Sequence, residues 1–374
     1  METKTPQSAF EEELLLLRAE RKAKRAHIEL KANLNVQRYE DDYNRIHNLD
    51  NQDYAICSIA GTLGGIIDTF MIGFPHPTKS GVKGGYLDGK IRAWFDKKYP
   101  PEVMERLSRT KGAKVPFDAQ DNRNLHDAPN VEVDGLSTYY HRLLSLGHDP
   151  LLGFIVGVYD ILNGKMTTIS KTGILTSQEM KIYAERKSYQ ILDAIKKVWV
   201  HLTTDVNTSM GLPVPLMSFF NTLQFGEIGK EKLSIAEVVQ GMYYQGYDFQ
   251  HFCAMSIPTM FIEILVRAAW WIKSTINGNP ILKSTPLFIG RKRNPKLDTM
   301  LCLSHGIFCA MNAVKVGVTE NPCAINYPEW CRFSELLIKE AKYQFIDKSS
   351  ERLIYVSDRI ISDYEQAKKR YIND

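Results

Sequence analysis

The chain has 374 residues, of which 44% are hydrophobic and 24% charged; this composition is typical of a folded globular protein and excludes general disorder. Its net charge of +4 at pH 7 is compatible with an anionic partner surface but indicates no specific nucleic-acid binding. Six cysteines occur without a CxxC pair, which favours buried free thiols over a zinc site made of cysteine. The charged N-terminal segment lacks a secretion signal, so we expect a cytoplasmic protein or one of the cytoplasmic membrane, not a secreted protein.

The first predicted element is a long charged helix over residues 8–50. No proline or glycine occurs from Ser8 to Asn51, and leucines and alanines form an apolar stripe between acidic and basic residues. This pattern predicts that residues 1–50 form a helical arm or coiled coil that contacts a protein partner. The alternative is an amphipathic helix that lies back on the body of the protein.

Residues 51–328 are predicted to form an apolar helical core. The first apolar run, 54–75, ends at a Pro-His-Pro sequence, because proline cannot continue a helix. Residues 76–135 are rich in Gly, Pro, Asp and Lys, and they predict a loop-rich insert with short helices near 88–96 and 101–110.

Capping residues predict the helices of the next segment. Asp149, which precedes a proline, predicts the N-cap of a short apolar helix over 151–162. Capping boxes at Thr176 and Ser234 predict two further helices, the first of them running to about Thr203.

Two more apolar runs follow. The second, 252–272, contains Pro258 and therefore predicts a kinked helix. The third is 300–318. Between them, residues 291–296 form a basic loop without aromatic residues, which is a weak signal for nucleic-acid binding.

The chain ends in a charged, amphipathic segment. Residues 329–374 predict C-terminal helices with a break near 348–350. Strand signals are weak, with short candidates only at 131–133 and 166–169. The fold class predicted is therefore all-α: a multi-helix bundle with glycine-rich apolar central helices and long charged N- and C-terminal helices.

The three apolar runs raise the question of a membrane. A spanning helix needs about 20 mainly apolar residues, and each run is about that long. Each also carries ionisable residues: Asp68 in the first, Glu263 and Arg267 in the second, and His305 and Lys315 in the third. A central charge costs about 2.5–3.5 kcal/mol in a membrane, whereas apolar residues contribute about 0.3–0.6 kcal/mol each. The sequence is compatible both with inserted helices and with the central helices of a soluble core.

One polar pattern, Gly-x-x-x-Gly-x-x-Asp, occurs in two apolar segments. It comprises Gly61, Gly65 and Asp68 in the first segment and Gly153, Gly157 and Asp160 in the second. On a helix these spacings place the glycines and the aspartate on one face, so a closely packed neighbour would bury the acid. The pattern predicts a buried polar centre. The alternative is ordinary tight packing, with both aspartates near helix ends and in contact with solvent.

Six polar residues are predicted to meet in one seam between the helices. They are Asp68, Asp160, Glu263, Arg267, His305 and Asn312. Such groups would provide a wet path or a latch between helices. The alternatives are an internal ion pair between Glu263 and Arg267, which are four residues apart, and a hydrogen-bonded core histidine at 305.

A second concentration of polar chemistry lies around His141, His148 and Asp149. Together with Asp160, these side chains could bind a divalent metal, and histidine with carboxylate suits metal-assisted hydrolysis. The alternative is that Asp149 only caps a helix.

Three functions are compatible with these patterns, and none of the common nucleotide-binding or protease motifs occurs. The leading hypothesis is a membrane-active protein that forms or gates an oligomeric pore without a cofactor, as a bacterial stress or antiviral effector would. The alternatives are a metal-dependent hydrolase that uses the histidine cluster and a divalent metal, and a helical scaffold. The partners expected are further copies of the chain, membrane lipid, and a protein bound through residues 1–50.

Overall fold

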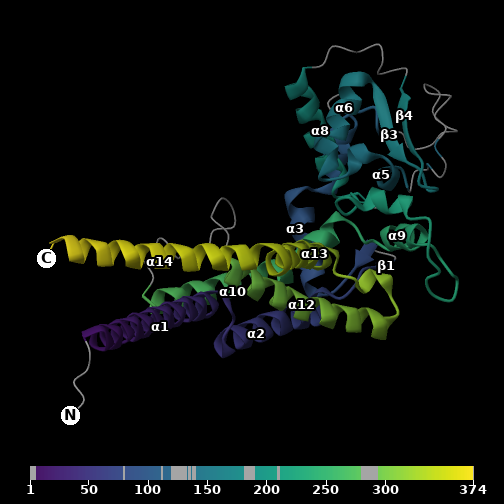
Figure 1. The fold of residues 1–374 in the computed structure, drawn as a ribbon. Coiled ribbons are helices and arrows are strands. Elements are labelled where there is room, and N and C mark those ends of the chain that lie inside the picture. Colours follow the sequence, from purple (N-terminus) through teal and green to yellow (C-terminus); the bar gives the residue numbers. More distant parts are fainter. Residues whose placement is uncertain are drawn as a thin grey trace. The chain divides into compact units, whose positions relative to one another are not determined.

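The protein is all-α, with two short two-stranded sheets, in a computed structural model of the chain (Figure 1). The structure describes residues 6–78, 81–110, 113–118, 133, 136, 140–180, 190–208, 211–278 and 294–373. Residues 131–132 of the expected strand and residues 291–293 of the basic loop lie outside these residues, and a helix begins at Pro295 within that loop.

The chain forms two compact units that differ from the predicted domains. The first unit comprises residues 1–57, 270–302 and 335–374, and the second comprises 58–269 and 303–334. The predicted N-terminal arm and the predicted C-terminal helices thus belong mainly to one unit.

Contacts between chain ends explain the first unit. The long helix α1 (Pro6–His47) packs against the C-terminal helix α14 (Lys348–Asn373). Tyr43 of α1 is buried and its hydroxyl lies 3.2 Å from that of Tyr343. Burying such a large side chain stabilises the pairing of the two ends.

The break expected at 348–350 is wrong. Helix α13 (Tyr327–Lys342) continues through a π-helical turn, η6 (Tyr343–Asp347), directly into α14. Ser350 donates its hydroxyl proton to the carbonyl of Asp347, so the serine is satisfied within the helix and does not end it.

Three apolar helices contribute to the second unit. They are α2 (Asn51–Ile67), which is extended by a π-helical turn η1 (Asp68–Ile72), α10 (Phe249–Ile276), and α12 (Pro295–Thr319). A Cβ atom at Gly61 would lie 2.4 Å from the backbone oxygen of Ser304, and one at Gly65 would lie 2.6 Å from the sulfur of Met311. These two glycines therefore allow α2 to approach α12 closely. Helix α10 runs through Pro258 as one element.

The rest of the second unit consists of shorter elements. They are β1 (His76–Thr78), β2 (Gly81–Lys83), α3 (Tyr86–Lys98), α4 (Pro101–Ser108), α5 (His141–Leu144), η2 (Leu146–His148), η3 (Leu152–Phe154), α6 (Val156–Asn163), β3 (Lys165–Ile169), β4 (Leu175–Glu179), α8 (Ile191–Asp205), η4 (Met217–Thr222), α9 (Ile235–Tyr244) and η5 (Pro322–Ala324). Helices α6 and α8 pack on one core with Phe117, which is fully buried.

The capping-box predictions had opposite outcomes. At Ser234 the reciprocal hydrogen bonds with Glu237 are present and open α9. At Thr176 the prediction is wrong, because the segment forms strand β4, which pairs antiparallel with β3. The side chains of β4 alternate between exposed and half-buried, with the period of two that is typical of a strand. The capping-box motif depends on two residues only and takes no account of this alternation.

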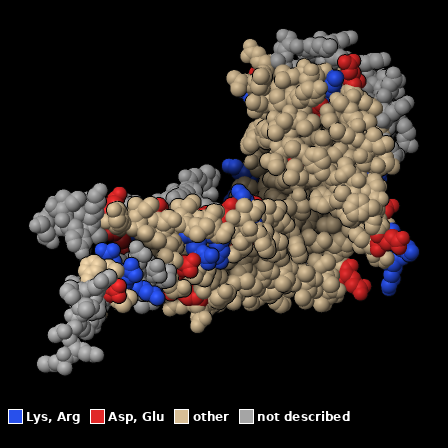
Figure 2. Space-filling model, in the orientation of Figure 1, with Lys and Arg blue, Asp and Glu red and all other residues tan. Residues whose placement is uncertain are grey.

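Three stretches are long and apolar enough to cross a membrane: Val36–Ile72, Phe249–Ile276 and Pro295–Thr319. In each, less than half of the apolar window is buried by the protein itself. Phe70, Ile264 and Val318 are among the exposed apolar side chains, and uncharged side chains cover most of the surface over α2 and α12 (Figure 2). An apolar surface of this kind is compatible with membrane association.

Candidate metal centre

Two neighbouring segments carry the histidines of the site. His148 ends η2, and His201 lies near the C-terminal end of α8. Gly147 allows η2 to pack against Phe117, because a Cβ atom at this position would lie 2.3 Å from the phenyl ring and only glycine fits. Phe117 meets the rings of His148 and His201 edge-on, with centroids 5.2 and 5.3 Å away, and so fixes the orientation of both. Asp118 follows Phe117 in the chain, and its carboxylate lies beside the same two imidazole rings.

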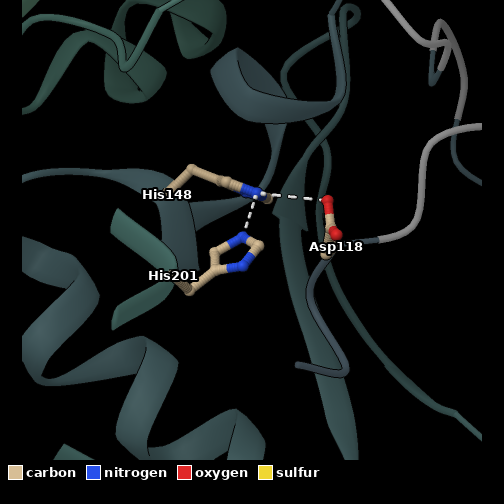
Figure 3. A group of neighbouring side chains, drawn as sticks. All are labelled: Asp118, His148 and His201. Atoms are coloured by element: carbon tan, nitrogen blue, oxygen red, sulfur yellow. Dashed lines mark hydrogen bonds and ion pairs between the residues drawn. The ribbon is translucent and has the colours of Figure 1, made fainter. Parts of the chain in front are cut away.

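The ligand atoms of these side chains converge. The Nε2 atoms of His148 and His201 lie 3.1 Å apart, and Nε2 of His148 lies 3.8 Å from Oδ1 of Asp118 (Figure 3). One ligand atom from each of the three residues lies within 4.8 Å of the others. Ligands bound at about 2.0–2.2 Å from a tetrahedral zinc ion are themselves about 3.3–3.6 Å apart. The two separations of 3.1 and 3.8 Å lie on either side of this range, so the three side chains are grouped as potential ligands of one ion.

Two further groups border this cluster. Nε2 of His141 lies 3.5 Å from Oδ1 of Asp118. Oδ2 of Asp205 lies 3.5 Å from Nε2 of His148 and 3.4 Å from Nε2 of His201. Arg142 donates two hydrogen bonds to this carboxylate, at 3.0 and 3.3 Å, and thereby fixes its position.

A hydrogen bond to a residue outside the cluster determines the tautomer of His201. Nδ1 of His201 lies 2.9 Å from the carbonyl oxygen of Ala113. A carbonyl only accepts, so Nδ1 carries the proton and the neutral ring keeps its Nε2 lone pair for a metal.

Electrostatics favour the protonation states that bind a cation. Burial lowers the pKa of His148 to about 4, so its ring is neutral near pH 7. Burial opposes ionisation of Asp118, but the neighbouring imidazoles of His141 and His148 outweigh it and hold the pKa of Asp118 well below its usual range. Neutral imidazole and ionised carboxylate are the forms that act as ligands.

The structure places the predicted cluster only in part. His148 and His141 lie at this centre, but Asp149 and Asp160 use their carboxylates elsewhere. Asp149 accepts the backbone N–H groups of Leu151 and Leu152 at 2.9 Å and of Leu216 at 2.5 Å, so it caps η3 and ties down a distant loop. Asp149 is therefore a capping residue and not a member of the metal cluster that the sequence predicted.

Asp160 is buried on α6, where it accepts the backbone N–H and the hydroxyl of Thr167. It belongs neither to the metal cluster nor to the seam between the apolar helices. The carboxylate is satisfied by the start of β3, because the turn after α6 brings that strand back along the helix.

The second glycine pair also differs from its prediction. Gly153 lies in the 3₁₀ turn η3 and Gly157 in α6, so the two do not form one α-helical face. A Cβ at Gly153 would lie 2.6 Å from the carbonyl oxygen of Gly147, and one at Gly157 would lie 3.0 Å from Phe117. Gly153 thus packs against the loop that carries His148, whereas Gly157 packs against Phe117 and against Val198 of α8.

Sequence reasoning missed Asp118, His201 and Asp205. A signal existed for two of them, because His201 and Asp205 are four residues apart and share one face of α8. Asp118 carries no such signal, since it lies in an irregular loop and only the fold brings it to the histidines.

Five of the six predicted seam residues join one buried network in the second unit. Asp68 accepts hydrogen bonds from Lys315 and Asn312, both at 2.9 Å, and from Asn326 at 2.7 Å. Asn326 in turn accepts the backbone N–H of Glu329 at 3.1 Å.

The network continues from Glu329 into α10. Nδ1 of His305 lies 2.8 Å from Glu329, and its Nε2 lies 3.6 Å from Glu263. Glu263 pairs with Arg267 at 2.6 Å and also with Arg332. Each acid of the network therefore contacts a base or a donor, as burial requires.

Comparison with protein-family models, with curated proteins and with solved structures finds no match. A functional assignment for this chain therefore has to be argued from its own geometry.

Proposed function

We propose that this protein is a membrane-associated hydrolase that uses a divalent metal held by His148, His201 and Asp118. The observation that carries the proposal is the convergence of two imidazole nitrogens and a carboxylate oxygen within 4.8 Å. A mixed nitrogen and oxygen ligand set suits zinc, manganese or iron.

The surroundings of the cluster favour a catalytic metal over a structural one. The histidines are almost fully buried, whereas the side chain of Asp118 is 32% exposed, so solvent reaches the cluster on the side of this residue. Structural zinc sites are closed by four protein ligands, and catalytic sites keep a position for water. Three ligands with one solvent-facing side fit the second type.

The residues around the cluster supply the remaining chemistry. A divalent metal held by these residues would activate a water molecule by lowering its pKa to about 7. Asp205, held by Arg142 beside both histidines, would accept the proton of that water. In the reaction, the oxygen of this water would bond to the electrophilic carbon or phosphorus while the bond to the leaving oxygen breaks. Asp205 would then pass the proton that it took up to the leaving oxygen.

Membrane association is the second half of the proposal. It is supported by the three membrane-length stretches and by the apolar side chains that they leave exposed. The location that we propose is therefore a membrane, with the apolar stretches in contact with lipid.

Elemental analysis of the purified full chain tests the metal. We expect about one equivalent of a transition metal per chain, and its loss in His148→Ala and His201→Ala. His251→Ala is the matched control, because His251 is also fully buried in this unit but pairs with Asp88. Folded wild-type protein that binds no metal after incubation with zinc, manganese or iron would overturn the proposal.

The pore and the scaffold stay predictions. The network around Asp68 and Glu263 is compatible with a latch between helices, as the pore hypothesis requires, but mutual pairing of its charges also serves ordinary helix packing. Oligomerisation and a partner bound through residues 1–50 likewise stay predictions.

A further inference from the structure

An exposed apolar surface lies on the segment that leads into α6, on α6 itself and on α8, next to the candidate metal centre. This surface, the α6–α8 face, consists of Leu151, Ile155, Tyr159, Ile191, Leu192, Ile195 and Trp199. Ile155 is 70% exposed and Trp199 61% exposed. Their spacings of three and four residues place them on the outward sides of the two elements, and Phe154 and Trp199, with ring centroids 6.0 Å apart, connect the elements.

The inward sides of the same helices are already apolar. Val158 and Ile161 of α6 and Ala194 and Val198 of α8 are buried in the core. A helix at a water-facing surface normally has a polar outward side, so apolar residues on both sides indicate a contact outside the described chain. Figure 2 shows that charged side chains are sparse in the part of the surface that contains α6 and α8.

The composition of the face favours a lipid surface as that contact. Trp199 and Tyr159 combine an apolar ring with a polar group, the side-chain type enriched where a membrane meets water. Lys196 lies three residues before Trp199 on α8, where its charge can reach lipid phosphates while its stem stays in apolar surroundings, whereas Lys197 donates to the carbonyl of Lys114 at 3.3 Å. Asp193 is the one exposed acid of α8.

We propose that the α6–α8 face lies in the headgroup and upper acyl region of a lipid bilayer and supplies the metal centre with a glycerophospholipid substrate. The statement about substrate rests on the proposed hydrolase function, whereas the statement about membrane contact stands without it.

The fold holds the two features close together. His148 precedes Leu151 by three residues, and His201 follows Trp199 by two. The ligands and the apolar face lie on opposite sides of the same elements, and a helix with its side chains is about 10–12 Å across. A headgroup at the bilayer surface would therefore lie within about one helix diameter of the metal ligands.

Fluorescence quenching tests the membrane contact directly. The full chain is reconstituted into vesicles of equal parts phosphatidylcholine and phosphatidylglycerol, with or without bromine on the acyl chains close to the headgroup. The chain has five tryptophans, so the emission of Trp199 is taken as the difference between wild type and Trp199→Phe. We expect the brominated lipid to quench this difference emission. An unquenched difference would overturn the proposed contact, whatever the enzymatic result.

Substitution tests the role of the face in substrate supply. The double variant Ile155→Asp, Trp199→Asp places charges in the face without touching a metal ligand. Leu175→Asp is the matched control, because Leu175 is 64% exposed but lies on β4. Hydrolysis of the vesicle phospholipid is followed by mass spectrometry, and hydrolysis of soluble bis-p-nitrophenyl phosphate by absorbance.

We expect the double variant to keep its metal, to hydrolyse the soluble ester within about twofold of wild type, and to lose phospholipid hydrolysis by about tenfold or more, because charged groups are excluded from the apolar interface. Equal phospholipid hydrolysis in the double variant and the control would refute supply through this face. Quenching without hydrolysis of any ester by metal-loaded protein would refute the hydrolase and leave the contact. Hydrolysis of the soluble ester alone would refute the phospholipid substrate.

Discussion

At the scale of single residues, Gly147 is the position on which the metal centre depends sterically. Its Cα faces the ring of Phe117, and the backbone at Gly147 lies directly before the ligand His148. A methyl group at this position has to displace either the ring of Phe117 or the loop that carries His148. Both of these also orient the proposed metal ligands.

We therefore expect Gly147→Ala to lower the free energy of unfolding by about 1–3 kcal/mol through overpacking and to reduce metal content. The control is Gly241→Ala in α9, where a Cβ meets no atom within 4 Å. In a helix interior that change should be neutral or stabilise by up to about 1 kcal/mol. Chemical denaturation and elemental analysis measure both effects. Equal stabilities for the two variants would contradict the steric argument.

Asp160 gives a prediction about pH. Burial raises its pKa to about 6, above the 3.8 of an unperturbed aspartate, although hydrogen bonds from Thr167 partly oppose this. The folded state therefore holds the proton more tightly, and the free energy of unfolding should decrease by up to about 3 kcal/mol as the pH rises from about 4 to 6.

Asp160→Asn cannot ionise and should remove this decrease. The measurement is the difference in unfolding free energy between wild type and variant across the pH range. The exposed Asp193→Asn on α8 provides the comparison. A difference that stays constant from pH 4 to 6 would show that the Asp160 pKa is not raised.

At the scale of elements, the contact between α2 and α12 combines close packing with a buried ion pair. Gly61 and Gly65 bring the helices together, and Asp68 and Lys315 pair at their ends with almost no exposure. Breaking a buried pair from one side leaves an uncompensated charge, which is more costly than removing both charges.

A double-mutant cycle measures this coupling. We expect Lys315→Met alone to cost about 3–5 kcal/mol and Asp68→Asn to be costly as well. The double variant should be more stable than the sum of the two single effects predicts. Unfolding is followed in detergent micelles. Strictly additive effects would mean that the two groups do not interact.

At the scale of the whole molecule, the exposed apolar surface of the long helices provides a test of the proposed membrane association. Met260 and Ile264 on α10 are 61% and 56% exposed. On a water-soluble surface, lysine at these positions would change stability by no more than about 0.5 kcal/mol. In a bilayer, each central lysine would cost about 2.5–3.5 kcal/mol.

We expect wild-type protein to stay with membranes after carbonate extraction and Met260→Lys, Ile264→Lys to be largely released or degraded. Leu175→Lys on β4 should behave as wild type. Wild-type protein that appears in the soluble fraction would remove the membrane half of the proposal and leave the metal centre to be judged separately.

The sequence by itself determined the helical class, the length and position of the apolar helices, and much of the polar network. These features follow from local rules: the spacing of apolar residues, proline, and glycine three or four positions from a polar residue. The α9 cap at Ser234 was correct for this reason, because both of its partners lie within one helical turn.

Tertiary structure alone decided the side-chain cluster that we propose as a metal centre. His148 is predictable as polar chemistry in an apolar segment, but Asp118 and His201 are 30 and 53 residues away from it in the chain, and no periodicity connects them. The same holds for Asp149, whose third hydrogen bond comes from the distant backbone of Leu216. Periodicity reports which side of an element is buried, whereas a ligand set depends on which elements meet, and that is fixed only when the core around Phe117 packs.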